Sequence, residues 1–242
     1  MKNEKINVLG IDFDAVKAAE ATEAIFHAAR QREAPYSVFT PNALISTFCY
    51  DDAALREVVN SASLVLADGV GVIGAAKRQG TPIPERVTGI DTADAVMARL
   101  AAVGGSVYLV GGEQGIAQSA ARALGEKYIG LRVLGASDGF FEDEEALVEE
   151  ISRLSPDLLL VGMGFPKQEL FISRNKDKLS VGAAMGVGGA IDVWAGKVRR
   201  APAVFVKLHF EWLWRMLCQP KRFLGLWRLL RYRFLTRRRF LR

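Results

Sequence analysis

An aspartate at the end of an apolar run is the residue of this sequence best placed to do chemistry. Leu64-Val65-Leu66-Ala67 leads to Asp68, and a glycine-rich segment and a helix-like stretch follow. In an open α/β sheet, ligands bind beyond the carboxyl ends of the strands. A carboxylate there can act as a general base that takes a proton from a reacting hydroxyl. We therefore predict that Asp68 ends a central strand and is catalytic; the alternative is that it only caps the next helix.

The glycines after Asp68 also match a dinucleotide-binding pattern. Gly69, Gly71 and Gly74 have the spacing G-x-G-x-x-G. That motif needs a second strand that ends in an acidic residue about 20 residues later. Residues 75–84 have no strand-like pattern. The sequence thus argues against an NAD-dependent oxidoreductase, which we keep as the alternative enzyme class.

Polar side chains and glycine-rich loops follow the other strand-like runs. Glycines between a strand and a helix let backbone N–H groups approach a phosphate, although plain tight turns use them too. Thr40 and Asn42 end a strand, and their alternative role is to cap the next helix. The candidate binding residues are Thr40, Asn42, Arg86, Gly111, Phe140, Gly164, Phe165, Lys167, Gln168 and Asp192.

Each of the larger candidate residues also has an alternative role that needs no ligand. Arg86 can contact a phosphate or be solvated in its loop. Phe140 can stack on a base or join the core. Lys167 and Gln168 can point toward an anion or a sugar, and Asp192 can accept from a uracil N–H or a ribose hydroxyl, or merely cap a helix. Because four successive strand ends carry such loops, we predict that they converge on a nucleotide diphosphate.

Asp12-Phe13-Asp14 spells D-x-D, a pattern that holds a divalent metal in many sugar-nucleotide enzymes. Two acidic residues between a strand and a helix are more often a turn and a cap. We predict the turn and the cap, and we expect neither a metal nor another cofactor.

The alternation of strand-like and helix-like segments predicts an α/β fold with a mostly parallel, Rossmann-like sheet in two closely packed regions. We expect an α/β catalytic body at 1–196 and a basic amphipathic helical tail at 197–242. The expected strands are 6–11, 36–40, the run before Asp68, 106–110, 131–134, 157–161 and 181–185.

Charge is distributed unevenly along the chain. Residues 197–242 hold 14 Lys and Arg against one acidic residue, whereas the other residues hold 18 against 26. The tail therefore carries +13 and the body −8. A basic tail on an acidic body is typical of a protein that binds a partner through one end. No uncharged run is long enough to span a bilayer.

The tail is expected to form two helices, at 204–217 and from Pro220 onward. Phe223, Leu226, Trp227, Leu230 and Phe234 make one apolar stripe in the second helix, with basic residues beside it. A helix of this kind lies in the interface of an anionic membrane. The alternatives are that the stripe packs on the body, or that the arginines bind nucleic acid, which we do not expect.

Taken together, these motifs resemble the WecG/TagA/CpsF family of bacterial glycosyltransferases. The resemblance covers nearly the whole chain. It rests on Thr40-Pro41-Asn42, Ala67 to Gly71, Arg86 to Asp91, Gly162 to Glu169, Gly188 to Asp192, Glu211 to Arg215 and Gln219 to Arg222.

The resemblance implies transfer of N-acetylmannosamine, or a related sugar, from a UDP-sugar to undecaprenyl-diphosphate-linked N-acetylglucosamine. It further implies an inverting, metal-independent reaction in teichoic acid or surface polysaccharide synthesis, at the cytoplasmic face of the cell membrane. Asp68 is then the base, and Arg215 and Arg222 reach the diphosphate. Gly225 stands where the resemblance leads us to expect another basic residue, for which Arg228 is a substitute. A homo-oligomer away from the membrane and a non-catalytic nucleotide-sugar-binding protein stay open.

Overall fold

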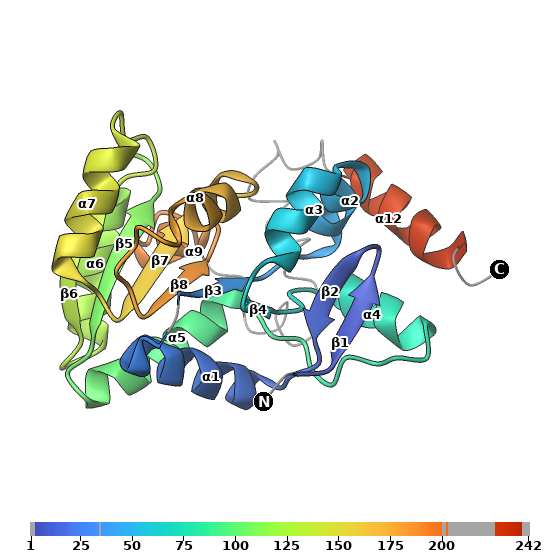
Figure 1. Ribbon diagram of the computed structural model, residues 1–242, viewed down its shortest axis with the longest axis horizontal. Helices are drawn as coiled ribbons and strands as arrows, with labels where there is room; N and C mark the ends of the chain where they lie inside the picture. The colour runs from blue at the N-terminus through green and yellow to red at the C-terminus, as the bar shows by residue number, and fades with distance from the viewer. Residues whose placement is uncertain (1–2, 34, 200–201, 203–225, 239–242) are drawn as a thin grey trace.

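A computed structural model describes residues 3–33, 35–199, 202 and 226–238 (Figure 1). Six strands form one sheet in the order β4-β3-β8-β7-β5-β6, with every neighbouring pair parallel. Two further strands form an antiparallel hairpin. The predicted α/β fold with a mostly parallel sheet is confirmed.

The strands are β1 (Lys5–Val8), β2 (Ile11–Asp14), β3 (Tyr36–Phe39), β4 (Leu64–Val65), β5 (Ser106–Gly111), β6 (Arg132–Ser137), β7 (Leu158–Gly162) and β8 (Ala183–Gly186). The helices are α1 (Ala18–Gln31), α2 (Ala43–Asp51), α3 (Ala53–Asn60), α4 (Val70–Arg78), α5 (Gly89–Ala102), α6 (Ile116–Lys127), α7 (Glu144–Leu154), α8 (Lys167–Asn175), α9 (Ala190–Trp194) and α12 (Leu226–Arg238).

Helices cover both faces of the sheet, and this explains why the inner strands β5, β7 and β8 are buried along their whole length. Successive side chains of a strand point to opposite faces. Val107 and Leu109 of β5 accordingly pack in one core with α1, α5, α6 and α9. Tyr108 and Val110 pack in the other core, with α3, α4, α7, α8 and the β1–β2 hairpin. The sheet thus forms a rigid frame between two cores.

The first predicted strand is wrong. Residues 6–11 do not form one strand, because the chain turns at Leu9 and Gly10 and returns as β2. Asp12 and Asp14 therefore lie in β2 and form neither a turn nor a cap; Lys17 is the N-cap of α1. The buried Asp14 carboxylate accepts a hydrogen bond of 2.7 Å from the backbone N–H of Val65.

The strand before Asp68 is an edge strand, whereas the sequence predicts a central one. β4 pairs only with β3 among the described strands. The β1–β2 hairpin contacts it through the Asp14 bond to Val65. Covering an edge strand in this way protects its backbone groups from pairing with another chain.

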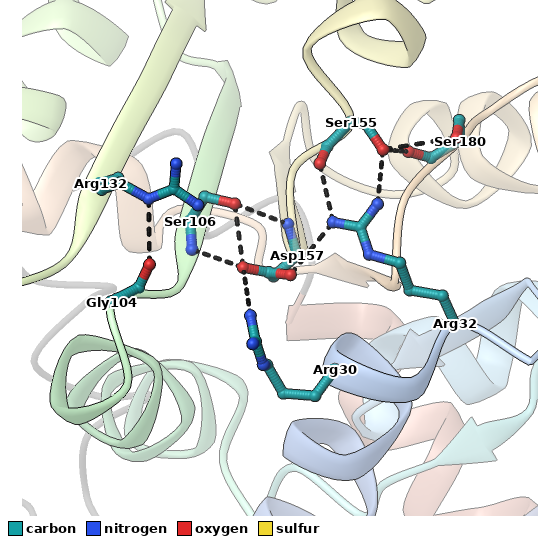
Figure 2. Close-up of polar contacts among 8 residues, drawn as sticks. All are labelled: Arg30, Arg32, Gly104, Ser106, Arg132, Ser155, Asp157 and Ser180. Carbon is teal, nitrogen blue, oxygen red and sulfur yellow. Dashed lines mark hydrogen bonds and ion pairs between the residues drawn. The ribbon is translucent and has the colours of Figure 1, made fainter.

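An ionic cluster ties together the amino-terminal ends of the strands (Figure 2). The Asp157 carboxylate accepts hydrogen bonds from the Ser106 N–H (2.7 Å) and the Ser106 hydroxyl (3.0 Å). It also pairs with Arg30 (3.2 Å) and Arg32 (3.1 Å) from the end of α1. Burial alone would raise the pKa of Asp157, but the bonds from Arg32 and Ser106 lower it below its ordinary range. The cluster fastens α1 to β5 and β7.

Candidate active site

The parallel sheet brings most of the predicted site residues to one edge, because all its strands end there. This carboxyl-terminal edge lies opposite the Asp157 cluster. Of the predicted residues, Arg215 and Arg222 lie outside the described ones. The others are Thr40 and Asn42 after β3, Asp68 after β4, Arg86 in the loop before α5, Gly111 at the end of β5, Phe140 after β6, Gly164, Phe165, Lys167 and Gln168 after β7, and Asp192 in α9 after β8.

Asp68 lies beside a nearly buried arginine, a neighbour that the sequence analysis did not connect with it. The two groups are 3.8 Å apart, from Arg86 Nη2 to Asp68 Oδ1. Arg86 is brought there by a hydrogen bond of 3.2 Å between the Val87 N–H and the Ala67 carbonyl. About a third of the Asp68 side chain is accessible to solvent, 30% against 16% for Arg86. The N-cap of α4 is Gly69, so Asp68 does not occupy the cap position.

Asn42 does cap a helix, as the alternative reading of this residue predicts. Its Oδ1 accepts hydrogen bonds from the N–H groups of Leu44 and Ile45 (2.9 and 3.1 Å). Asn42 also packs against the turn that carries Asp68, because its Cβ lies 3.7 Å from where a Cβ on Gly69 would be. Asn42 therefore backs the turn after β4.

Thr40 joins two strand ends. Its hydroxyl donates a long hydrogen bond of 3.5 Å to the carbonyl of Gly186 at the end of β8. The hydroxyl oxygen also lies 3.0 Å from where a Cβ on Gly89 would be, so α5 begins against Thr40. Contact of Thr40 or Asn42 with a substrate stays a prediction.

The glycines at this edge fall into two groups. At Gly111 and Gly162 an added Cβ would lie 2.4 and 2.6 Å from a backbone carbonyl oxygen, so the packing of the loops requires glycine there. At Gly164, Gly188 and Gly189 an added Cβ would meet no atom of the described residues within 4 Å. Gly189 has a φ of −77°, which any residue adopts. Neither the backbone conformation nor packing against the described residues requires glycine at 189.

Phe140 is exposed, so its alternative place in the core is excluded. The exposed fraction of this residue is 71%. The next residue, Phe141, packs instead on Phe171, with 5.7 Å between ring centroids. Lys167 Nζ lies 5.9 Å from the centroid of the Phe140 ring. An exposed aromatic ring beside a cation suits a base that carries a phosphate.

Phe165 and Gln168, in the loop after β7 and the first turn of α8, contact protein groups. Phe165 packs on Phe48 of α2, with 5.7 Å between ring centroids. Gln168 is buried, and both ends of its amide form hydrogen bonds within the protein. Their roles toward a ligand stay predictions.

Asp192 lies beside a lysine that the sequence analysis assigned to the tail. Lys197 Nζ is 3.8 Å from Asp192 Oδ1 and 2.8 Å from Glu113 Oε2 in the loop after β5. The side chain of Asp192 is 29% exposed. Lys197 thus connects the loop after β5 with helix α9; only contacts between distant segments could have revealed this.

The described part of the tail, α12, docks on α2 and α4. Arg228 stacks on Phe48, with Cζ 3.9 Å from the ring centroid, and Arg231 pairs with Asp51 at 2.5 Å. Tyr232 is buried, and its hydroxyl donates to the carbonyl of Gly71 at 3.3 Å. The three stripe residues whose side chains are described point elsewhere and are exposed: Trp227, Leu230 and Phe234. For these residues the alternative of packing on the body is wrong.

The interpretation of Gly69, Gly71 and Gly74 as a dinucleotide-binding motif finds no support in the structure. Gly71 serves helix packing, since a Cβ there would lie 2.9 Å from that of Ala43. Residues 79–88, all of which the structure describes, contain no strand, so the second strand of a dinucleotide-binding unit is missing.

The described residues contain no cluster of three His, Cys, Asp or Glu side chains suited to a metal ion. No helix in the described ranges is long and apolar enough to cross a membrane.

A shallow hollow of about 620 Å³ lies between α6 and β6. None of the predicted site residues lines it, and its walls come from the helix and strand surfaces at the outer edge of the sheet. We therefore base the site on the strand ends and not on this hollow.

Comparison with known proteins identifies the family of this chain. Residues 6–241 match the model of the glycosyl transferase WecG/TagA/CpsF family. The chain is also 33% identical over 220 residues to the N-acetylglucosaminyldiphosphoundecaprenol N-acetyl-beta-D-mannosaminyltransferases of Staphylococcus aureus strains NCTC 8325 / PS 47 and COL. The alignments cover 90% of this chain and 86% of each relative. This chain belongs to the WecG/TagA/CpsF family and is a glycosyltransferase.

Proposed function

We propose that this glycosyltransferase moves N-acetylmannosamine, or a related sugar, from a UDP-sugar to N-acetylglucosamine linked to undecaprenyl diphosphate. The names of the relatives support the transferred sugar and the lipid-linked acceptor. The observation that carries the proposal is the position of Asp68, part-exposed beside Arg86 at the carboxyl-terminal edge of the sheet. The reaction belongs to the synthesis of teichoic acid or another surface polysaccharide.

In this proposal Asp68 is the general base. It accepts the proton of the acceptor hydroxyl while that oxygen bonds to the anomeric carbon of the donor sugar, and the bond from this carbon to the UDP oxygen breaks. A single displacement inverts the anomeric centre, so an α-linked donor gives the β linkage in the names of the relatives. The leaving diphosphate needs cations, for which Arg86 and the tail residues Arg215 and Arg222 are the candidates.

The donor nucleotide is expected over the glycine-rich loops. Gly164, Gly188 and Gly189 leave open space there, which allows close approach of the backbone to a diphosphate. Phe140 supplies an exposed ring for the uracil, and Asp192 an acceptor for its N–H or for a ribose hydroxyl. No metal is required, because cationic side chains take its place in stabilising the leaving group.

The tail is proposed to hold the enzyme on the cytoplasmic face of the cell membrane as a peripheral protein. Trp227, Leu230 and Phe234 face away from the body, and Arg233 and Arg237 beside them are exposed. Apolar and basic residues on one exposed surface suit an anionic lipid interface. A lipid-linked acceptor would meet the enzyme there.

A transfer assay tests the proposal. Purified full-length enzyme is incubated with a panel of UDP-sugars and a short-chain lipid-diphosphate N-acetylglucosamine acceptor, with and without EDTA. We expect product from UDP-N-acetylmannosamine or a close relative of it, at the same rate with EDTA. UDP binding without product from any sugar would favour the non-catalytic binding protein. Binding of NADH in place of UDP would favour the oxidoreductase.

A further inference from the structure

Glu169 is a buried acid for which the proposed reaction has no use. It lies in the first turn of α8 and is 2% exposed. Its Oε2 has no hydrogen-bond partner, and no Lys, Arg or His nitrogen of the described residues lies within 4.0 Å of its carboxyl group. Burial raises the pKa of Glu169 above its ordinary value. An unpaired carboxylate is costly in such a place, so burial disfavours the charged form of Glu169.

Within the part of the chain that the structure describes, the surroundings of Glu169 supply no compensating positive charge. The titratable neighbour from α2 is Cys49, which is also buried. Burial raises the pKa of the Cys49 thiol to about 12, so Cys49 is a neutral thiol. Neither group neutralises the other as an ion pair.

Glu169 is the first member of a hydrogen-bonded chain that ends at the open loop after β8. Its Oε1 accepts from Gln168 Nε2 at 2.9 Å, and Gln168 Oε1 accepts from the Gly188 N–H at 2.9 Å. Between these bonds the Gln168 side chain crosses Gly186 so closely that a Cβ there would lie 2.9 Å from Nε2. The amide of Gln168 is therefore held in one orientation.

We propose that Glu169 is a positioning residue: its neutral carboxyl group orients Gln168, and Gln168 fixes the Gly188–Gly189 turn that faces the donor nucleotide. Gly188 and Gly189 have open space where a side chain would be. The donor side of this proposal rests on the proposed function, whereas the hydrogen-bonded chain does not. One readout can therefore be taken without any ligand.

Two substitutions test separately whether position 169 needs an acid and whether it needs a hydrogen-bond acceptor. Glu169→Gln keeps the length and an acceptor oxygen without the acid, and Glu169→Met keeps the length without the acceptor. Glu144→Met is the matched control, because Glu144 accepts from the Asn175 amide (2.8 Å) at the other end of α8. All variants are made in the full chain.

The ligand-free readout is hydrogen exchange of the Gly188 amide, and the second readout is the Kd of UDP. In Glu169→Met we expect faster exchange at Gly188 and about tenfold weaker UDP binding, the effect of losing one hydrogen bond. Glu169→Gln and Glu144→Met should match the wild type in both. Unchanged exchange in Glu169→Met, or equal damage in Glu169→Gln, would overturn the proposal. A wild type that does not bind UDP would instead contradict the proposed function and leave the exchange result valid.

A double-mutant cycle tests whether Glu169 acts through Gln168. Adding Glu169→Met to Gln168→Met should change neither Gly188 exchange nor UDP binding further, and additive losses would overturn the relay. If the Met variants do not fold, infrared spectroscopy at neutral pH still tests the neutral form. The wild type should show a protonated-carboxyl band that Glu169→Gln lacks, and absence of such a band would overturn the proposal.

Discussion

At the amino-terminal edge of the sheet, Asp157 accepts four hydrogen bonds from Ser106, Arg30 and Arg32, and its side chain is 6% exposed. At the carboxyl-terminal edge, Asp68 lies 3.8 Å from Arg86, and 30% of its side chain is exposed. Both are aspartates beside arginine, one directly before β7 and the other after β4 of the same sheet. They differ in how much of the carboxylate the surrounding protein buries.

This difference separates structural from chemical use of the same residue types. A carboxylate surrounded by donors holds elements together and offers little to a substrate. A carboxylate that keeps accessible surface can still take a proton from a bound hydroxyl. The glycines follow the same division, since some are closed by backbone contacts and others open onto space.

The largest effect on stability is expected at the amino-terminal edge. Asp157→Ala should lower the free energy of unfolding by about 3 kcal/mol, because it leaves the buried Ser106 without its acceptor and removes one ion-pair partner from each of Arg30 and Arg32. Asp68→Ala should lower it by less, about 1 kcal/mol, because the Asp68 carboxylate is part-exposed and lies 3.8 Å from its Arg86 partner. Urea unfolding measures both. Equal losses in the two variants would break the comparison.

The glycines provide the next test. Gly162→Ala should cost about 1–3 kcal/mol, because its Cβ would lie 2.6 Å from the Gly188 carbonyl oxygen. Gly189→Ala should leave the free energy of unfolding nearly unchanged and weaken UDP binding. Gly125→Ala in α6, where a Cβ meets Val133 at an ordinary 4.0 Å, is the control for both properties. Normal UDP binding by Gly189→Ala would show that the nucleotide does not contact this loop.

The structural role of Asp157 should also appear in the pH dependence of the free energy of unfolding. Asp157 has a lowered pKa in the folded protein, so its contribution is present above the ordinary carboxyl pKa of about 4 and is lost as pH falls through the folded value. The free energy of unfolding of Asp157→Asn, measured between about pH 6 and pH 2, should therefore fall less steeply than that of the wild type. Parallel curves would show that the cluster does not control acid stability.

The smallest effect is expected where α12 docks. The hydrogen bond from Arg231 lowers the pKa of Asp51, yet Asp51 and Arg231 are both part-exposed. Asp51→Asn should speed hydrogen exchange of the α12 amides and leave the urea midpoint of the body unchanged, because exposed ion pairs contribute little. Exchange in α12 at the wild-type rate would mean that Tyr232 and its neighbours hold the helix without this pair.

Local sequence signals predicted much of the fold. Strands such as β5 and β7 follow from short apolar runs, and the Asn42 cap from a polar residue before a helix. The β1–β2 turn escaped detection because apolar residues continue through Leu9. The edge position of β4 also escaped, because strand order depends on contacts between distant segments.

The site was predictable as a set of strand ends but not as a set of contacts. Parallel strands must end together, so Asp68 and the glycine-rich loops share one edge. The pairing of Arg86 with Asp68 and the burial of Gln168 depend on tertiary packing. In α12 the pattern identified the apolar stripe, but it did not reveal that Arg228 and Arg231 face the body.

The most direct test of the account is Asp68→Asn, with transfer rate and UDP affinity measured on the same preparation. The amide has nearly the size of the carboxylate but cannot accept the proton. We predict that kcat falls by about 10²- to 10⁴-fold while the Kd of UDP stays within about twofold of the wild type. Near-normal turnover by Asp68→Asn would contradict the account, because the proton would then go to another group.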